Sequence, residues 1–166
     1  MLTFVVYDSL YGNTEQIAQA IARGASAVGA VRVMSTADAT GAFAERPDFV
    51  FLGGPTQRRG MSPGLKTFVE ALPAKHLGGI QAAAYDTRLR MAMFLSGSAA
   101  KDAADRLRKS GANVVAQPES FFVESAKVPA GTKPLPGFAH LLAGELERAE
   151  GWGRTVASVA LKGQAA

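Results

Sequence analysis

Short apolar runs alternate with amphipathic segments along the chain, and this alternation limits the possible folds more than any other feature of the sequence. The run at 49–53 is apolar at nearly every position, as in a strand that is covered on both faces. Strands that are each followed by a helix predict a doubly wound parallel α/β sheet. We predict strands at 2–7, 31–34, 49–53, 81–85 and 113–115, the last resuming at 120–123.

Helix signals fill the segments between these strands. Ser62 followed by Pro63 is a favourable helix start, and Ser98 is a favourable N-cap. Trp152 lies at helical spacing from other apolar residues, so we expect it in the core. The predicted helices cover 13–27, 63–72, 98–110 and 138–161, and the predicted loops cover 38–45, 54–61, 86–97 and 125–137.

The composition excludes several classes of active site. The chain has 166 residues, of which 48% are hydrophobic, and this fits one domain with a sizeable core. It has no cysteine, which excludes disulfides, thiolate nucleophiles and cysteine-ligated metals. His76 and His140 are the only histidines and are too isolated in sequence for a metal site. We therefore predict neither a metal ligand nor a side-chain catalytic residue.

Charge and hydropathy limit the classes of partner that the protein is expected to bind. The formal net charge is +4, but the basic residues are interspersed with acidic ones, which does not favour a nucleic-acid surface. No apolar run reaches the roughly 18 residues of a membrane helix. The first strand begins at once, without the pattern of a signal peptide. We expect a cytoplasmic protein with no membrane or nucleic-acid partner.

The segment Ser9-Leu10-Tyr11-Gly12-Asn13-Thr14 is the strongest candidate for a binding site. It joins a predicted strand to a predicted helix, where free N–H groups and the positive end of the helix dipole face a bound anion. Ser9 and Thr14 offer hydroxyl groups, and Gly12 permits a positive φ. The segment lacks the lysine of a nucleoside-triphosphate loop, which favours a single terminal phosphate. An ordinary strand–helix turn, which favours the same residue types, is the alternative.

These residues resemble the flavodoxin family, whose members are five-stranded doubly wound proteins that bind flavin mononucleotide (FMN). The family's first loop reads Ser/Thr-x-Thr-Gly-Asn-Thr, and four positions match, while Tyr11 stands where the family has threonine. Gly-Gly-Pro-Thr at 53–56 resembles the loop over one flavin face, and Tyr-Asp-Thr-Arg at 85–88 fits the loop on the other face. The resemblance implies a flavodoxin-like fold with strand order 2-1-3-4-5 and FMN as the cofactor.

The same resemblance assigns the flavin site to three loops. Backbone N–H groups near 56–59 would bond N5 and the carbonyl edge of the flavin. The loop after the third strand has no aromatic residue, so Tyr11 is the nearest stacking candidate and a weakly held flavin is expected. The predicted cofactor-binding residues are Ser9, Leu10, Tyr11, Gly12, Asn13, Thr14, Pro55, Thr56, Gln57, Arg58, Arg59, Asp86, Thr87 and Arg88.

Two adjacent arginines depart from the acidic character of flavodoxins. Arg58 and Arg59 are expected beside the crevice, with Arg88 and Arg90 adding to a basic rim. A cation near flavin N1 would stabilise the reduced anionic flavin, or it could hold an anionic second substrate. Asp86 has turn capping as its alternative role.

We predict electron transfer or flavin-dependent reduction, with a redox partner protein or a small-molecule electron acceptor. Two alternatives stay open. One is a flavodoxin-like binding or regulatory module that does not hold flavin, since a fold alone never establishes a function. The other is a quinone-type reductase in which Arg58 and Arg59 hold a nicotinamide donor. A homodimer packed through an alanine-rich helix face is also open.

Overall fold

A parallel sheet forms the centre of the molecule in a computed structural model, which describes residues 1–39, 41–72, 77–125 and 139–164. Its strands lie in the order β2-β1-β3-β5-β7, which is the predicted 2-1-3-4-5, and β8 adds an antiparallel edge strand. The strands on this path are β1 (Leu2–Tyr7), β2 (Ala30–Ser35), β3 (Phe49–Gln57), β5 (Gln81–Leu89), β7 (Glu119–Ser125) and β8 (Ala139–Leu141).

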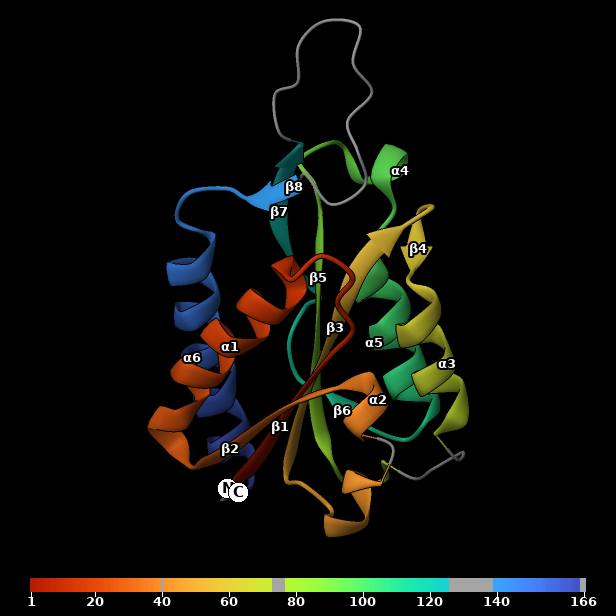
Figure 1. Ribbon diagram of the computed structural model, residues 1–166. Coiled ribbons are helices and arrows are strands. Elements are labelled where there is room, and N and C mark those ends of the chain that lie inside the picture. Colours follow the sequence, from red (N-terminus) through yellow and green to blue (C-terminus); the bar gives the residue numbers. More distant parts are fainter. Residues whose placement is uncertain (40, 73–76, 126–138, 165–166) are drawn as a thin grey trace, which may run out of the picture.

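Helices cover both faces of the sheet (Figure 1). One face carries α1 (Asn13–Ala25) and α6 (Glu145–Gln164), and the other carries α3 (Pro63–Ala71) and α5 (Ala99–Lys109). Strand β3 shows why both layers are needed, because Phe49 and Phe51 are buried beneath α1 and α6 while Val50 and Leu52 are buried on the other side. The remaining short elements are η1 (Ser26–Val28), α2 (Thr36–Ala39), η2 (Ala42–Glu45), β4 (Gly60–Met61), α4 (Met93–Ser96) and β6 (Asn113–Val114).

The helix signals are largely confirmed. Pro63 occupies the first turn of α3, and the Ser98 side chain accepts a hydrogen bond from the Lys101 N–H at the start of α5. Ser62 precedes α3 as predicted, but its hydroxyl donates to Asp8 instead of capping the helix. Trp152 packs edge-on against Phe51, so its assignment to the core is also confirmed.

Two predicted loops are wrong in part. At 54–61, β3 continues to Gln57 and turns back into β4, because its end pairs with β5 on one side and with β4 on the other. At 86–97, β5 continues to Leu89 between β3 and β7, and α4 follows. Neither extension is visible in the local sequence, since Gly54, Pro55 and Asp86 belong to residue types that are depleted in strands.

The predicted start of the last helix is also wrong. Residues 139–141 form β8, which covers the free edge of β7, and α6 begins only at Glu145. The predicted fifth strand divides into β6 and β7, which both pair with β5. The loop predicted at 125–137 begins at the last residue of β7, and the rest of it lies outside the described residues, as does His76. In the described part of the chain, no helix combines the length and hydropathy needed to cross a bilayer.

Candidate functional site

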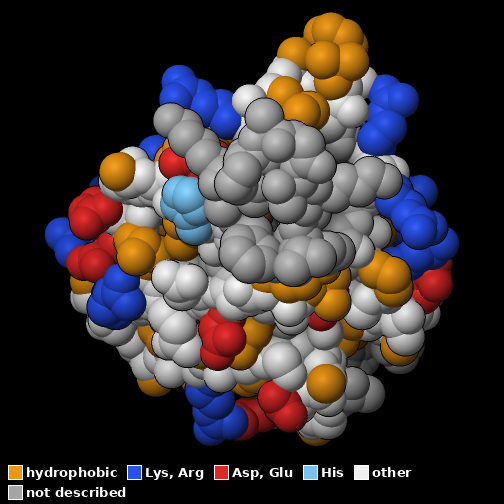
Figure 2. Space-filling model, turned by 45° about the horizontal axis from the view of Figure 1, so that its top comes forward, with side chains coloured by type: hydrophobic (Ala, Val, Ile, Leu, Met, Phe, Trp, Pro, Cys, Tyr) orange, Lys and Arg blue, Asp and Glu red, His pale blue; other side chains and the backbone are white. Residues whose placement is uncertain are grey.

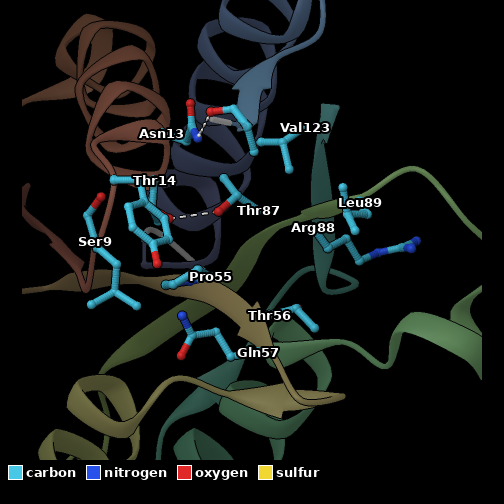
Figure 3. A pocket seen from close by; sticks show the side chains of 13 residues that line it. Ser9, Asn13, Thr14, Pro55, Thr56, Gln57, Thr87, Arg88, Leu89 and Val123 are labelled. Carbon is cyan, nitrogen blue, oxygen red and sulfur yellow. Dashed lines mark hydrogen bonds between the residues drawn. The ribbon is translucent and has the colours of Figure 1, made fainter. Parts of the chain in front are cut away.

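A crevice opens where β1, β3 and β5 end (Figure 3). The chain leaves β1 towards β2 on one side and leaves β3 towards β5 on the other, which makes this edge the topological switch point of the sheet. Ligands of open α/β sheets bind at such a point. The cavity measures about 190 Å³ and is lined by Ser9, Leu10, Tyr11, Asn13, Thr14, Pro55, Thr56, Gln57, Thr87, Arg88, Leu89, Val123 and Ala139.

The start of α1 faces this crevice without a side-chain cap. Gly12 is the residue before the helix and has a φ of 83°, in the left-handed region that favours glycine. A Cβ at Gly12 would meet nothing within 4 Å, so glycine is required for its backbone and not for space. The Gly12 N–H donates to Ser9 Oγ over 3.1 Å. The first N–H groups of α1 therefore remain available to an anion.

Two buried hydroxyl groups meet at the floor of the crevice. Thr14 Oγ1 and Thr87 Oγ1 lie 2.7 Å apart and share one hydrogen bond, as the dashed line in Figure 3 shows. One hydroxyl donates in this bond and the other accepts, so one proton is left over. Ser9 Oγ accepts from Gly12 and likewise keeps its own proton. The site thus combines hydroxyl donors with the N–H groups of α1.

Asn13 ties the loop at 9–14 to the edge of the sheet. Its side-chain nitrogen donates to the carbonyl oxygen of Ala139 in β8 over 2.8 Å. This bond links residues 126 positions apart and explains why Ala139 lines the crevice. The Asn13 amide is therefore used as a structural donor, and its backbone N–H is the group that remains at the helix start.

Tyr7 and Glu15 set the charge on the outer side of this loop. The Tyr7 hydroxyl donates to Glu15 Oε1 over 3.1 Å. Partial burial, this hydrogen bond and the charges of Glu15 and Asp38 together raise the pKa of Tyr7. Tyr7 therefore stays neutral near pH 7 and holds the Glu15 carboxylate.

Asp86 lies beneath the crevice and is not among its lining residues. Its buried Oδ2 accepts hydrogen bonds from Thr56 Oγ1 at 3.0 Å, Ser98 Oγ at 2.7 Å and the Ala100 N–H at 3.0 Å. Its Oδ1 has no partner within the described part of the structure. The alternative role predicted for Asp86, capping of the turn that follows it, is wrong, because the backbone N–H from which it accepts belongs to the start of α5.

Arg88 lines the crevice with its side-chain stem, while its guanidinium points away from Thr87 (Figure 3). The guanidinium donates to Ser120 Oγ, to the Met91 carbonyl and to Ser96 Oγ, and it stacks 5.0 Å from the centre of the Phe122 ring. Only 8% of Arg88 is exposed. The prediction that Arg88 belongs to a basic rim is wrong, because β7 supplies partners that bury its charge.

Arg58 and Arg59 occupy the tip of the β3–β4 hairpin, outside the residues that line the crevice. Both have positive φ values, 46° and 71°, as a two-residue hairpin loop requires. The Arg59 guanidinium donates to the carbonyl oxygen of Phe94. Gly12 is likewise not a lining residue, although its backbone shapes the start of α1.

Three lining residues, Leu89, Val123 and Ala139, are absent from the predicted cofactor-binding set. Val123 ends the strand segment predicted at 120–123, so its place at this sheet edge followed from the topology already predicted. Leu89 belongs to the unpredicted end of β5, and Ala139 belongs to the unpredicted β8. All three are apolar and make the wall opposite α1 more hydrophobic than the sequence had indicated.

Comparisons with known proteins agree with this fold. The flavodoxin family model matches residues 5–124. Oxidised Flavodoxin 1 from Bacillus cereus superposes with a TM-score of 0.73 at 19% identity, over 95% of this chain and 98% of that chain. A flavodoxin, WrbA-like protein from Agrobacterium tumefaciens gives a TM-score of 0.71 at 21% identity, over 97% and 98%.

A flavodiiron protein from Giardia intestinalis superposes with a TM-score of 0.73 at 20% identity, but this chain spans only 36% of its length. No curated protein matches the chain. Identities this low establish the fold, which is flavodoxin-like as predicted. The match to the family model covers well over half of the 166 residues, and the chain therefore belongs to the flavodoxin family.

Proposed function

We propose that the crevice binds FMN, with the phosphate at the start of α1, and that the protein passes electrons through the bound flavin. The acceptor would be a redox partner protein or a small molecule. The observation that carries this proposal is the uncapped start of α1, which opens onto an apolar crevice at the switch point of the sheet.

The donors at the crevice suit a phosphate monoester. The N–H groups at the start of α1, the Ser9 hydroxyl and the spare proton of the Thr14–Thr87 pair offer uncharged donors to a dianion. Among the lining residues the only cationic side chain is Arg88, and its guanidinium is engaged elsewhere. The helix dipole and neutral hydroxyls would therefore balance the phosphate charge.

The remaining walls suit a planar apolar ring. Pro55, Leu89 and Val123 give the crevice apolar walls, and Tyr11, which is 53% exposed, stands at its mouth. When bound, the isoalloxazine ring accepts and releases electrons, and the protein supplies its position and surroundings. The described lining residues offer hydroxyl and amide groups beside these apolar walls.

The absorbance spectrum of purified protein, before and after FMN is added, tests the proposal. We expect flavin absorbance, quenching of FMN fluorescence on binding, and weaker binding of riboflavin, which lacks the phosphate. Colourless protein that leaves FMN fluorescence unchanged would favour a module without flavin. Oxidation of a nicotinamide donor by the FMN-loaded protein would favour the reductase alternative.

A further inference from the structure

Next to the crevice, the segment 89–95 exposes a run of apolar side chains. All seven of its residues are exposed, and all except Arg90 are apolar. Phe94 is 73% exposed, and Leu89, Met91, Met93 and Leu95 are exposed by 40% to 57%. So many solvent-exposed apolar side chains in one place mark an interaction site.

Contacts from Arg88 of β5 and from the β3–β4 hairpin hold this segment in place. Arg88 lies beneath it and donates to the Met91 carbonyl over 2.9 Å. Arg59, from the β3–β4 hairpin, donates to the Phe94 carbonyl. The Gly97 backbone pairs with Arg59 so closely that a Cβ at Gly97 would lie 2.0 Å from the Arg59 carbonyl oxygen. The apolar side chains are therefore displayed on a fixed backbone.

The hairpin that supports the segment keeps two arginines where asparagine and glycine are favoured. Arg58 and Arg59 both have positive φ, a conformation that costs an ordinary L-residue free energy. Backbone strain of this kind persists only where the surrounding structure enforces it, and it is frequent at functional sites. Arg59 places its cation directly beside Phe94.

The surroundings of the segment are basic. The hollow beside it contains Arg59 and Lys101, with Asp102 as the one acid among its lining residues, and Arg90 lies within the segment itself. Figure 2 shows apolar side chains projecting at the upper edge of this face, with Lys and Arg side chains on either side. An apolar centre with a basic rim complements a partner surface with an apolar centre and an acidic rim.

The segment is also continuous with the proposed flavin site. Leu89 belongs to it and lines the crevice, and the exposed Leu10 and Tyr11 stand on the opposite lip. A partner seated on 89–95 would therefore sit at the crevice mouth.

We propose that the segment 89–95, with Arg59, Arg90 and Lys101, is the docking surface for an acidic redox protein. The proposal rests on the flavin site proposed above, because the partner exchanges electrons with that flavin. Two copies of this chain meeting through this face would bring like charges together, which disfavours a second copy. A lipid surface is disfavoured because α4 is a single turn, far shorter than the helices that hold peripheral proteins on membranes.

The test uses an acidic plant-type ferredoxin as the probe. The ferredoxin is first reduced with dithionite. On mixing, its iron–sulfur cluster loses one electron, and the oxidised flavin of this protein gains that electron. Stopped-flow absorbance follows the transfer at low and high salt. Calorimetry with flavin-free protein measures docking independently, so that loss of flavin binding and loss of docking are distinguishable.

A charge-reversed pair is compared with a matched control. Arg90→Glu with Lys101→Glu alters the docking surface, and Arg154→Glu with Lys162→Glu makes the same change in net charge on α6. We expect the first pair to slow transfer at least about tenfold at low salt and to remove its salt dependence. The control pair should change the rate less than about twofold. Phe94→Ser should weaken ferredoxin affinity about tenfold, and FMN affinity should be unchanged in all of these variants.

Three results would overturn the proposal. Equal effects of the two charge-reversed pairs would mean that only net charge matters. Undiminished docking of Phe94→Ser would remove the apolar segment from the interface. Sedimentation with vesicles of phosphatidylcholine and phosphatidylglycerol that depends on Phe94, without docking of ferredoxin, would assign the surface to lipid.

Discussion

Replacing Thr14 by valine tests whether the start of α1 holds a phosphate. Valine keeps the shape of threonine but removes the hydroxyl. In the native protein Thr14 is 1% exposed and its Oγ1 lies 2.7 Å from Thr87 Oγ1. Thr14→Val should therefore remove a donor to the phosphate and also leave the Thr87 hydroxyl buried without this partner.

The two losses have different sizes and different readouts. A hydrogen bond to a charged group contributes about 1.5–3 kcal/mol, which corresponds to a rise in the FMN dissociation constant of about 13- to 160-fold. A buried hydroxyl without its partner costs about 1–3 kcal/mol of unfolding free energy. Thr87→Val is the matched control, because it breaks the same pair but leaves the Thr14 hydroxyl free to donate.

Fluorescence titration with FMN and with riboflavin separates these effects, and urea unfolding measures stability. Thr14→Val should weaken FMN binding but not riboflavin binding, whereas Thr87→Val should lower stability to a similar extent with FMN binding near the native value. If Thr14→Val weakened FMN and riboflavin equally, or neither, the phosphate would not lie at Thr14 and the reasoning would be refuted.

Three further predictions concern the scaffold. Burial raises the pKa of Tyr85 well above its ordinary value of 10.0. The folded state therefore holds the Tyr85 proton more tightly than the unfolded state, so its contribution to stability is complete below pH 10 and is lost as pH rises through the folded pKa. Tyr85→Phe should shift alkaline unfolding, followed by circular dichroism, to higher pH. Gly153→Ala would place a Cβ 2.4 Å from the Ile21 carbonyl oxygen and should cost about 1–3 kcal/mol in urea unfolding, whereas Gly151→Ala, with nothing within 4 Å, should not destabilise. Arg58→Asn should stabilise the hairpin by up to about 1 kcal/mol, seen as a higher melting temperature, because asparagine tolerates its positive φ better; an unchanged or lower value would contradict the strain assigned to Arg58.

Local sequence patterns were sufficient to predict the strands and helices that bury an apolar face. The alternation of strands and helices predicted a doubly wound parallel sheet, the resemblance to flavodoxins supplied the strand order, and the loop at 9–14 was placed on the first strand–helix turn. These inferences held because the periodicity of apolar residues and the residues at helix starts act within a few positions of one another. Given that strand order, the switch-point rule indicates the edge of the sheet at which a ligand is expected.

Residues near the crevice that depend on pairing between distant segments were the ones predicted poorly. Arg88 was expected to face solvent, but Ser120 and Phe122 of β7 bury its guanidinium. Asp86 was expected near a turn, but it sits within an extended strand and accepts hydrogen bonds from β3 and α5. From the sequence alone, a carboxylate or a guanidinium is expected to be exposed to solvent. Only its partners in the folded chain determine whether it is buried.

The sequence by itself determined the layered α/β architecture and the place of the loop at 9–14 between the first strand and the first helix. Tertiary structure alone decided how far β3 and β5 extend, that β8 covers the last edge, and which arginines are free to meet a partner. The physical reason is that burial patterns and helix starts are local properties of the chain. The length of a strand and the burial of a charged side chain depend instead on hydrogen-bond partners dozens of residues away.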